Sequence, residues 1–290
     1  MLRLQRHGSL KIGRFEAHLL SDGTFRLDGG AMYGTVPRNL WCRHESPDEK
    51  NRIPLALGCL LIRTPSGRNV LVDAGLSSKY DANAKFKTIY AVDRSVTLRD
   101  ELKARGLAPA DIHLVINTHL HFDHAGGDTE FDDAGRPVPA FPNARYLIQK
   151  DEWEDANHPH ERNAASYMEE NFAPLEDKKV LELVSGDYEI EPGLRVTRSG
   201  GHTRGHQCVT IESEGQTAIY LGDLVPTRAH VPLPYVMGYD LYPVDTLECK
   251  RKFYAEALAK DWTLLFQHDV GRRSAKLVLH EGRYAARCDD

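Results

Sequence analysis

The stretch Asn-Thr-His-Leu-His-Phe-Asp-His-Ala-Gly-Gly at positions 117–127 constrains this chain more than any other. It places three imidazoles and one carboxylate close together, and a divalent cation such as zinc selects these side chains. Residues two apart do not share a face of an α-helix, so His119 and His121 project to the same side only from extended or turning backbone. Asp123 and His124 can then turn towards a second metal ion. A metal site explains this density of ligands better than a histidine-rich surface loop does.

The residues around this cluster predict how the chain presents it. The apolar run at 114–116 predicts a buried strand that ends just before the cluster. Gly126 and Gly127 follow the cluster, where they relieve the steric limits on a turn. Upstream, Asp73 ends another predicted strand and precedes Ala-Gly. We expect its carboxylate to orient a metal-binding imidazole rather than to cap the next turn.

Composition and charge narrow the class of protein. A chain of 290 residues is long enough for one large α/β domain or two small ones. Its 41% hydrophobic and 27% charged residues are ordinary for a globular enzyme. The formal net charge of -5, without a basic stripe, argues against a nucleic-acid partner.

The apolar segments and the cysteines indicate the cellular compartment in which the protein is expected. The longest apolar run, residues 55–62, is far shorter than the ~20 residues needed to cross a bilayer, and residues 1–7 lack the apolar core of a signal peptide. The five cysteines are scattered and form no CxxC pair, which argues against a disulfide framework. We therefore expect a cytoplasmic protein without a membrane partner.

The hydrophobic pattern predicts hairpins that alternate with helices, which favours helices covering packed sheets. A β-hairpin is expected at residues 10–27 with its turn at Ser21-Asp22-Gly23, and a second strand pair at 55–63 and 69–73. Residues 128–143, rich in Asp, Gly and Pro, predict a long surface loop. The other expected strands are 112–116, 144–148, 194–197, 209–212, 217–221 and 262–266, and the expected helices are 96–105, 151–156, 164–172 and 247–258.

Two segments rich in proline, glycine, methionine and aromatic residues are candidates for the wall of a substrate cleft. The segment 29–41 offers Met32 and Tyr33 as substrate contacts. It fits a packed surface loop or a contact between two copies of the chain equally well, so a homodimer is an alternative. The segment 227–239 offers His230, Tyr235 and Tyr239. A structural crossover is its alternative, and His230 fits a core position as well as a substrate contact.

Candidate ligands recur at the ends of predicted strands. His202, Asp223 and His268 each follow a strand, as His119 does, and neighbouring strand ends converge on one edge of a sheet sandwich. We therefore expect two metal ions, with these ligands: His119, His121 and His202 on one, Asp123, His124 and His268 on the other, and Asp223 bridging both. The coordination position left open for a shared water is typical of a catalytic site.

With these motifs the chain resembles the metallo-β-lactamase superfamily. The family's HxHxDH signature corresponds to the four ligands at 119–124, and its later ligand positions correspond to Gly201-His202-Thr203, Gly222-Asp223 and His268. The resemblance runs from about residue 55 to 270. It implies an α/β (α+β) fold, a four-layer αβ/βα sandwich with a dimetal centre at one edge, in which residues 1–290 form a single domain. The ligand set is similar to that of the dizinc quorum-quenching lactonases and related organophosphate-hydrolysing enzymes.

One position departs from the lactonase pattern. The acyl homoserine lactonases carry a tyrosine three residues after the bridging aspartate, where it stabilises the substrate oxyanion, and this chain has Pro226 there. Proline donates no hydrogen bond, so Tyr235 or Tyr239 would have to substitute. His206 resembles the second histidine of the family's GHTxGH motif, which supports the ligands, and it is not expected to bind metal.

These features predict a dinuclear zinc hydrolase, with iron, manganese or cobalt as alternative metals. Two zinc ions lower the pKa of a shared water towards roughly 7, so that a metal-bridging hydroxide attacks a carbonyl while Asp123 or Asp223 holds the nucleophile by a hydrogen bond. The apolar cleft favours a small ester or lactone, above all an N-acyl homoserine lactone. A phosphotriester or aryl ester is the alternative, because the lactonase tyrosine is missing. A non-catalytic module that kept only the fold is disfavoured, since all seven ligands are present.

Overall fold

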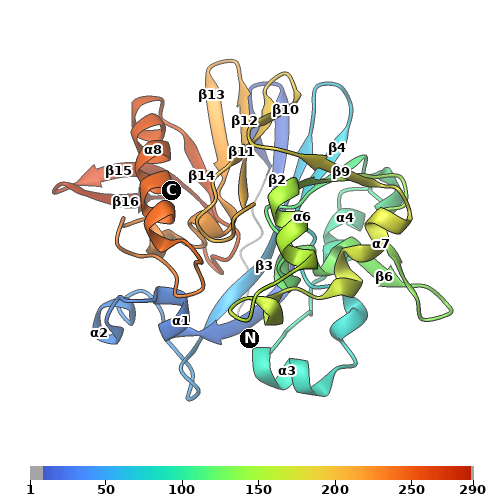
Figure 1. Ribbon diagram of the computed structural model, residues 1–290. Helices are drawn as coiled ribbons and strands as arrows, with labels where there is room; N and C mark the ends of the chain where they lie inside the picture. Colours follow the sequence, from blue (N-terminus) through green and yellow to red (C-terminus); the bar gives the residue numbers. More distant parts are fainter. Residues whose placement is uncertain (1–8, 289–290) are drawn as a thin grey trace.

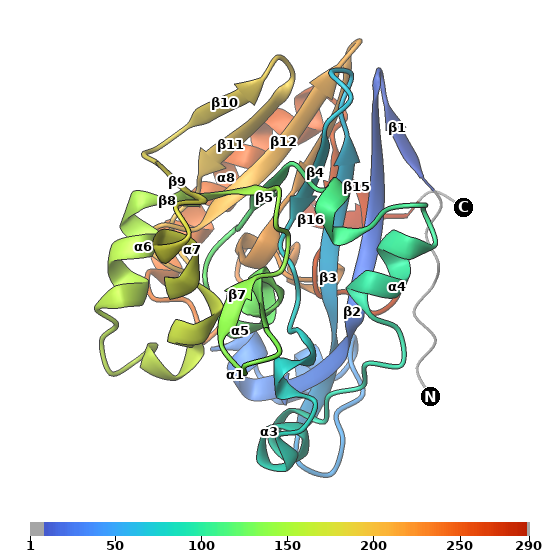
Figure 2. The same ribbon diagram turned by 90° about the vertical axis from the view of Figure 1, so that its right-hand side faces the viewer.

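The structure is a computed structural model and describes residues 9–288. Two seven-stranded sheets pack face to face, and helices cover the outer face of each (Figures 1 and 2). The four-layer αβ/βα arrangement predicted from the sequence is therefore confirmed. The expectation about a signal peptide concerned residues 1–7, which lie outside the described residues.

Both large sheets keep their strands in chain order. Across the first sheet, the strands are β1 (Leu10–Ile12), β2 (Phe15–Asp28), β3 (Arg52–Arg63), β4 (Asn69–Val72), β5 (Leu114–Ile116), β8 (Arg145–Gln149) and β9 (Leu181–Val184). Across the second, they are β10 (Tyr188–Glu191), β11 (Leu194–Arg198), β12 (Gln207–Ser213), β13 (Gln216–Tyr220), β14 (Thr263–Leu265), β15 (Ser274–His280) and β16 (Arg283–Arg287). A separate small hairpin contains β6 (Thr129–Phe131) and β7 (Pro137–Pro139).

The α-helices are mostly short. They are α1 (Gly29–Tyr33), α2 (Arg38–Trp41), α3 (Ala84–Tyr90), α4 (Leu98–Lys103), α5 (Phe122–Ala125), α6 (Lys150–Asn157), α7 (Ala173–Asp177) and α8 (Pro243–Ala259). The 3₁₀ turns are η1 (Ser78–Tyr80), η2 (Pro109–Asp111), η3 (Gly126–Asp128), η4 (Ala164–Ser166), η5 (Glu169–Asn171), η6 (Gly222–Leu224) and η7 (Arg228–His230). Helices α1, α2 and α3 gather at one end of the sandwich, at the bottom of Figure 1.

Alternating side chains of the central strands enter different cores, because successive residues of a strand point to opposite faces. In β3, Leu60 and Ile62 belong to the core between the two sheets, whereas Cys59 and Leu61 belong to the core beneath α4, α6 and α7. The outer face of the second sheet packs against α8 through residues such as Phe253. The run at 55–62 is buried on both faces, which accounts for its continuous hydrophobicity.

The parallel strand pairs determine where the chain delivers its polar residues. β4 runs parallel to β5, and β13 runs parallel to β14. The chain leaves the carboxyl ends of the first pair towards Asp73 and His119, and those of the second pair towards Asp223 and His268. Contacts among His119, His268 and Asp223, described below, bring these ends together at one edge of the sandwich.

The predicted position of the turn in the hairpin at residues 10–27 is wrong. The turn lies at residues 13–14, with Ile12 opposite Phe15, and β2 then continues through Ser21-Asp22-Gly23 with a register shift against β3. Gly23 adopts φ 110° at this bulge. The Asp22 carboxylate is used in tertiary contacts rather than in a local turn, because it accepts hydrogen bonds from the backbone N–H groups of Leu76, Ser77 and Leu98.

Three other predicted elements need correction. Residues 128–143 are not one loop, since they contain the β6–β7 hairpin. Residues 164–172 form the turns η4 and η5 instead of a helix. Helix α8 starts at Pro243, before the predicted residue 247, because proline suits the first turn of a helix, where its missing N–H has no partner to lose.

Two predictions about the chain as a whole concern membranes and disulfides. No helix within residues 9–288 is both long and apolar enough to span a bilayer. All five cysteines are free thiols, as their scattered positions predicted.

Candidate metal centre

Four loops at one edge of the sandwich carry the seven predicted ligands. The loop after β5 and helix α5 supply the cluster at 119–124, and the β11–β12 connection supplies His202. Asp223 lies in η6 after β13, and His268 follows β14. All seven side chains are at least nine-tenths buried, and the structure brings them all together.

The first group of ligand atoms surrounds one oxygen of the Asp223 carboxylate. Nε2 of His202 lies 3.2 Å from Asp223 Oδ2 and 3.1 Å from Nδ1 of His121. Nε2 of His119 lies 3.9 Å from the same oxygen. His119, His121 and His202 therefore direct ring nitrogens into one small space.

The second group surrounds the other oxygen of the same carboxylate. Asp223 Oδ1 lies 3.0 Å from Nε2 of His268 and 3.6 Å from Nε2 of His124. These two nitrogens are 3.3 Å apart, and Asp123 Oδ2 lies 3.6 Å from each. Asp223 thus faces the first group with one oxygen and the second with the other, the placement expected of a bridging ligand.

The donor set fits divalent cations. Three groups of residues each have their ligand atoms within 4.8 Å of one another. These groups are His119, His121 and His202; His119, His124 and Asp223; and Asp123, His124 and His268. The Nε2 atom of His119 is buried and has no hydrogen-bond partner in the protein. Crowded imidazole nitrogens with lone pairs directed at a common point are costly unless a cation receives them.

The charges of the cluster are strongly coupled. Burial and neighbouring imidazoles lower the pKa of His119 and His121 well below the usual range, which keeps their rings neutral. Burial alone would lower the pKa of His124, but the carboxylates of Asp123, Asp223 and Asp73 raise it well above the usual range. Burial would raise the pKa of Asp223, but the surrounding imidazoles lower it well below its ordinary value. His119 and His121 are therefore neutral beside an ionised Asp223, whereas His124 holds a proton that a metal ion would have to displace on binding.

Outer contacts fix the orientation of the imidazoles. The Asp73 carboxylate lies 3.2 Å from Nδ1 of His124 and accepts hydrogen bonds from the backbone N–H and the hydroxyl of Thr118. This geometry agrees with the predicted orienting role of Asp73. Nδ1 of His268 donates to the carbonyl of Ala56 at 2.7 Å. Such partners set the tautomer and the ring plane of a ligand.

Sequence reasoning missed Asp240, which orients His202. Its Oδ1 lies 2.9 Å from Nδ1 of His202, and its Oδ2 accepts a hydrogen bond from the hydroxyl of Thr246 in α8. The only signal in the sequence was its position one residue after the predicted cleft segment 227–239. That signal cannot identify which imidazole an acid would reach.

Glu152 is a second residue that sequence reasoning missed. This α6 side chain is 1% exposed and accepts hydrogen bonds from the Leu120 N–H and the Tyr167 hydroxyl, both at 2.9 Å, and from the Thr203 hydroxyl at 2.5 Å. Leu120 stands between two ligands, and Thr203 follows His202. Glu152 therefore connects both loops of the first ligand group.

His206 is close to the centre but serves the backbone, in line with the expectation that it supports the ligands. Its Nε2 accepts a hydrogen bond from the Asp223 N–H at 3.0 Å, and its Nδ1 lies 2.5 Å from the Ser199 hydroxyl. Burial lowers the pKa of His206 to about 3, so the ring is neutral. Gly222 has φ 50°, and a Cβ there would come within 2.7 Å of His206 Nε2. The absence of a side chain at Gly222 therefore allows the hydrogen bond between His206 and the Asp223 N–H.

Gly126 and Gly127 allow close packing and do not adopt unusual backbone angles. A Cβ on Gly126 would lie 2.5 Å from the Leu76 carbonyl oxygen, and one on Gly127 would overlap the Ala74 carbonyl oxygen. Neither residue has positive φ. The glycines therefore let the ligand cluster pack against the loop that begins at Asp73, instead of easing a turn as predicted.

A pocket of about 320 Å³ opens onto the ligand cluster. Its floor contains His121, Asp123, His202, Asp223 and His268. Its apolar wall contains Leu27, Met32, Tyr90, Phe122, Met237 and Tyr239. Its remaining wall contains Arg162, Asn163, Ala165, Ser166 and Gly238. A volume of this size suits a small ligand with an apolar part.

The predicted substrate contacts divide into two sets. Met32 and Tyr239 line the pocket. Tyr33 is fully buried and stacks on Trp41 and on His230, with ring centroids 5.4 Å and 4.5 Å apart. His230 Nε2 donates to the Met32 carbonyl at 2.9 Å, so the ring supports the pocket wall from behind. Tyr235 packs edge-on against Tyr33 and does not line the pocket.

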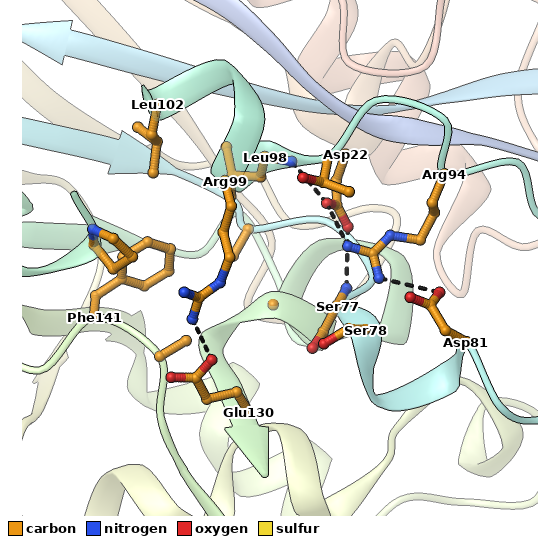
Figure 3. Close-up of a pocket in the computed structure, with 15 residues that line it drawn as sticks. Asp22, Ser77, Ser78, Asp81, Arg94, Leu98, Arg99, Leu102, Glu130 and Phe141 are labelled. Atoms are coloured by element: carbon orange, nitrogen blue, oxygen red, sulfur yellow. Dashed lines mark hydrogen bonds and ion pairs between the residues drawn. The ribbon is translucent and has the colours of Figure 1, made fainter. Parts of the chain in front are cut away.

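A second pocket, of about 130 Å³, lies beside the Asp22 bulge (Figure 3). Its charged side chains are paired with one another. Arg94 contacts Asp22 at 2.9 Å and Asp81 at 3.3 Å, and Arg99 contacts Glu130. These pairs give each of the five charged side chains an opposite charge and tie the bulge to the loop after Asp73, which gives the pocket a structural role.

Comparisons with known proteins agree with this geometry. A profile of the metallo-beta-lactamase superfamily matches residues 58–268. An N-acyl homoserine lactonase of Bacillus cereus is 34% identical over 183 residues, which are 59% of this chain and 64% of that protein, so the match spans just under two thirds of the relative. A probable metal-dependent hydrolase from Staphylococcus aureus aligns over 96% of this chain and 99% of its own, with 34% identity and a TM-score of 0.86. The structure of the dizinc quorum-quenching lactonase AidC, solved with its product N-hexanoyl-L-homoserine, aligns over 98% of this chain and 97% of its own with a TM-score of 0.75. Because the sequence identity is 18%, this similarity supports only the fold.

Proposed function

This chain belongs to the metallo-β-lactamase superfamily, and from that premise we propose that it is a metal-dependent lactonase acting on N-acyl homoserine lactone-type substrates. The observation that carries the proposal is the convergence of seven ligands into two groups that share the Asp223 carboxylate. The resemblance to an N-acyl homoserine lactonase adds support for the substrate class.

The residues on either side of Asp223 would hold two divalent ions. We assign these ligands: His119, His121 and His202 to one ion, Asp123, His124 and His268 to the other, and Asp223 to both. Zinc suits a set of imidazole and carboxylate donors, and iron, manganese or cobalt are the alternatives. When bound, such a pair lowers the pKa of a water and polarises a carbonyl oxygen.

Asp123 and Asp223 supply the protein's part of the chemistry. Both line the floor of the pocket, where a substrate carbonyl and a water would meet. An ionised carboxylate only accepts hydrogen bonds, so each can hold the attacking water by its protons and direct its lone pair at the carbonyl. The strongly lowered pKa of Asp223 keeps this acceptor ionised throughout the neutral range.

The apolar wall supplies affinity for an acyl chain. Met32, Phe122 and Met237 are almost fully buried and line the pocket beside the ligands. Burying one CH₂ group is worth roughly 0.8 kcal/mol, so a chain of several carbons would gain several kcal/mol there. Flexible methionines can adapt to chains of different length.

Metal analysis combined with a substrate panel tests this function. We expect about two metal ions per chain, and the highest kcat/KM for an N-acyl homoserine lactone among lactones, phosphotriesters, aryl esters and β-lactams. Asp223→Ala should lose metal and turnover together, whereas His280→Ala, at an exposed position far along β15, should keep both. Full activity in a metal-free preparation would contradict the proposal.

One observation favours a second candidate, a phosphotriester or aryl-ester hydrolase. Pro226 occupies the position three residues after Asp223 and is buried, and it has no hydrogen-bond donor for a lactone oxyanion. Tyr239 lines the pocket and is the residue that we propose as a substitute donor. If Tyr239→Phe hydrolyses lactones as fast as the wild type, and the wild type prefers a phosphotriester, this second candidate is the better description.

A further inference from the structure

Asn163 is a buried polar side chain in the pocket wall that has no partner in the protein. It immediately precedes η4, and its backbone is fully used, because its N–H donates to the His160 carbonyl and its carbonyl accepts from the Ser166 N–H. The residue is only 5% exposed, yet neither Nδ2 nor Oδ1 of its side chain makes a hydrogen bond within the protein. It does not cap the turn that follows it.

An arrangement of this kind is costly for the fold and needs an explanation. A buried donor or acceptor without a partner costs roughly 1–3 kcal/mol, and a carboxamide brings both. The neighbouring Arg162 differs, since its Nη2 donates to the carbonyl of Gly238 at 2.6 Å. Asn163 is therefore a buried wall residue whose side-chain donor and acceptor both lack a partner within the protein.

The chemistry of a carboxamide specifies its complement. The carboxamide of Asn163 has a donor, its NH₂ group, beside an acceptor, its carbonyl oxygen. A secondary amide is complementary, because its C=O accepts a hydrogen bond and its N–H donates one. A phosphotriester, an aryl ester or a plain lactone has acceptors only, so each would leave Oδ1 of Asn163 unpaired. A pocket with such a group discriminates strongly against ligands that cannot pair with it.

We propose that Asn163 is a specificity-determining residue that recognises the acylamino group of the substrate through both its Nδ2 and its Oδ1 atoms. This inference rests on the proposed lactonase function and adds to it which group of the substrate the pocket wall recognises. The lactone ring would lie over Asp123 and Asp223, the acyl chain along the apolar wall, and the amide between them at Asn163.

The test compares two lactones that differ only in the amide. One is N-hexanoyl homoserine lactone, and the other is a γ-butyrolactone that bears an alkyl chain of equal length in place of the acylamino group. Asn163→Leu and Asn163→Ala should each lower kcat/KM at least tenfold for the first lactone and less than twofold for the second. Asn157→Leu is the matched control, because Asn157 is exposed and its side chain bonds only to the Trp153 carbonyl. The Asn163 variants should have a thermal midpoint no lower than that of the wild type, since they lose no hydrogen bond within the protein and no longer bury an unpaired carboxamide.

A binding measurement separates this inference from the proposed function. By calorimetry, metal-loaded wild type should bind N-hexanoyl-L-homoserine at least tenfold more tightly than the amide-free hydroxy acid, and Asn163→Ala should lose that preference. If the wild type opens neither lactone, the lactonase proposal fails while calorimetry still decides the role of Asn163. Equal losses on both lactones, or a preference that survives in Asn163→Ala, would overturn the assignment.

Discussion

Glu152 offers the sharpest test of how the protein supports its ligands, because one side chain ties together two ligand loops. We compare Glu152→Ala with Glu152→Gln. Alanine removes the acceptor for Leu120, Tyr167 and Thr203 at once. Glutamine keeps the shape, since its oxygen can accept from Leu120 and Tyr167 while its amide donates to the Thr203 oxygen after the hydroxyl rotates.

The expected magnitudes follow from these contacts. Each buried donor that loses its acceptor costs roughly 1–3 kcal/mol, and relief from burying a carboxylate offsets part of the sum. We expect Glu152→Ala to lose about 3 kcal/mol of unfolding free energy and Glu152→Gln about 1 kcal/mol or less. Because the loops of His121 and His202 lose their common anchor, metal affinity should fall about 10- to 100-fold in the alanine variant. In the glutamine variant it should change little.

Urea unfolding of the metal-free proteins measures the stabilities, and competition with a chromophoric chelator measures the metal affinities. The reasoning is refuted if the two variants have equal unfolding free energies. It is also refuted if the alanine variant is destabilised but binds metal as tightly as the wild type, because Glu152 would then support the fold without positioning the ligands.

Three further outcomes are expected. Asp240→Ala should weaken metal binding roughly 10- to 100-fold by chelator competition, because His202 loses the carboxylate at its Nδ1, and unchanged affinity would contradict this. Burial lowers the pKa of Lys250 to about 7, so between pH 7 and 9 the unfolded chain holds a proton on this side chain that the folded protein has lost. The unfolding free energy of the wild type should therefore rise by roughly 1.4 kcal/mol per pH unit relative to that of Lys250→Met. Parallel pH profiles of stability for the two proteins would refute this prediction. Gly127→Ala should lower the thermal midpoint and the metal affinity together, because its Cβ would push the Ala74 carbonyl and with it the loop of Asp73, and a variant that behaves like the wild type would rule out this packing constraint.

The layered fold and the convergence of the seven candidate ligands could be predicted from the sequence because both depend on local patterns. Buried strands are visible in the sequence as continuous apolar runs. The candidate ligands follow directly after such runs or cluster in one short stretch, so their positions indicate which strand ends lie at one edge of the sandwich. The parallel pairing of β4 with β5 and of β13 with β14 then brings the strand ends together.

The residues that the sequence analysis missed, or to which it gave the wrong role, depend on distant partners. Ser21-Asp22-Gly23 has the composition of a turn, but Asp22 binds backbone groups more than fifty residues away, which makes a bulge in a long strand favourable. Tyr33 is an aromatic residue in a glycine-rich segment, and only the fold decides that it stacks on Trp41 instead of facing the pocket. Asp240 and Glu152 carry no local signal, since their roles come from imidazoles and loops elsewhere in the chain.

The bridging position of Asp223 is the central claim, and anomalous diffraction from a metal-loaded crystal tests it most directly. Data collected at the absorption edge of the bound metal should give two peaks, one near Oδ1 of Asp223 with His124 and His268, and one near Oδ2 with His119 and His202. A single peak, or two peaks that leave Asp223 outside the coordination of either ion, would contradict the account.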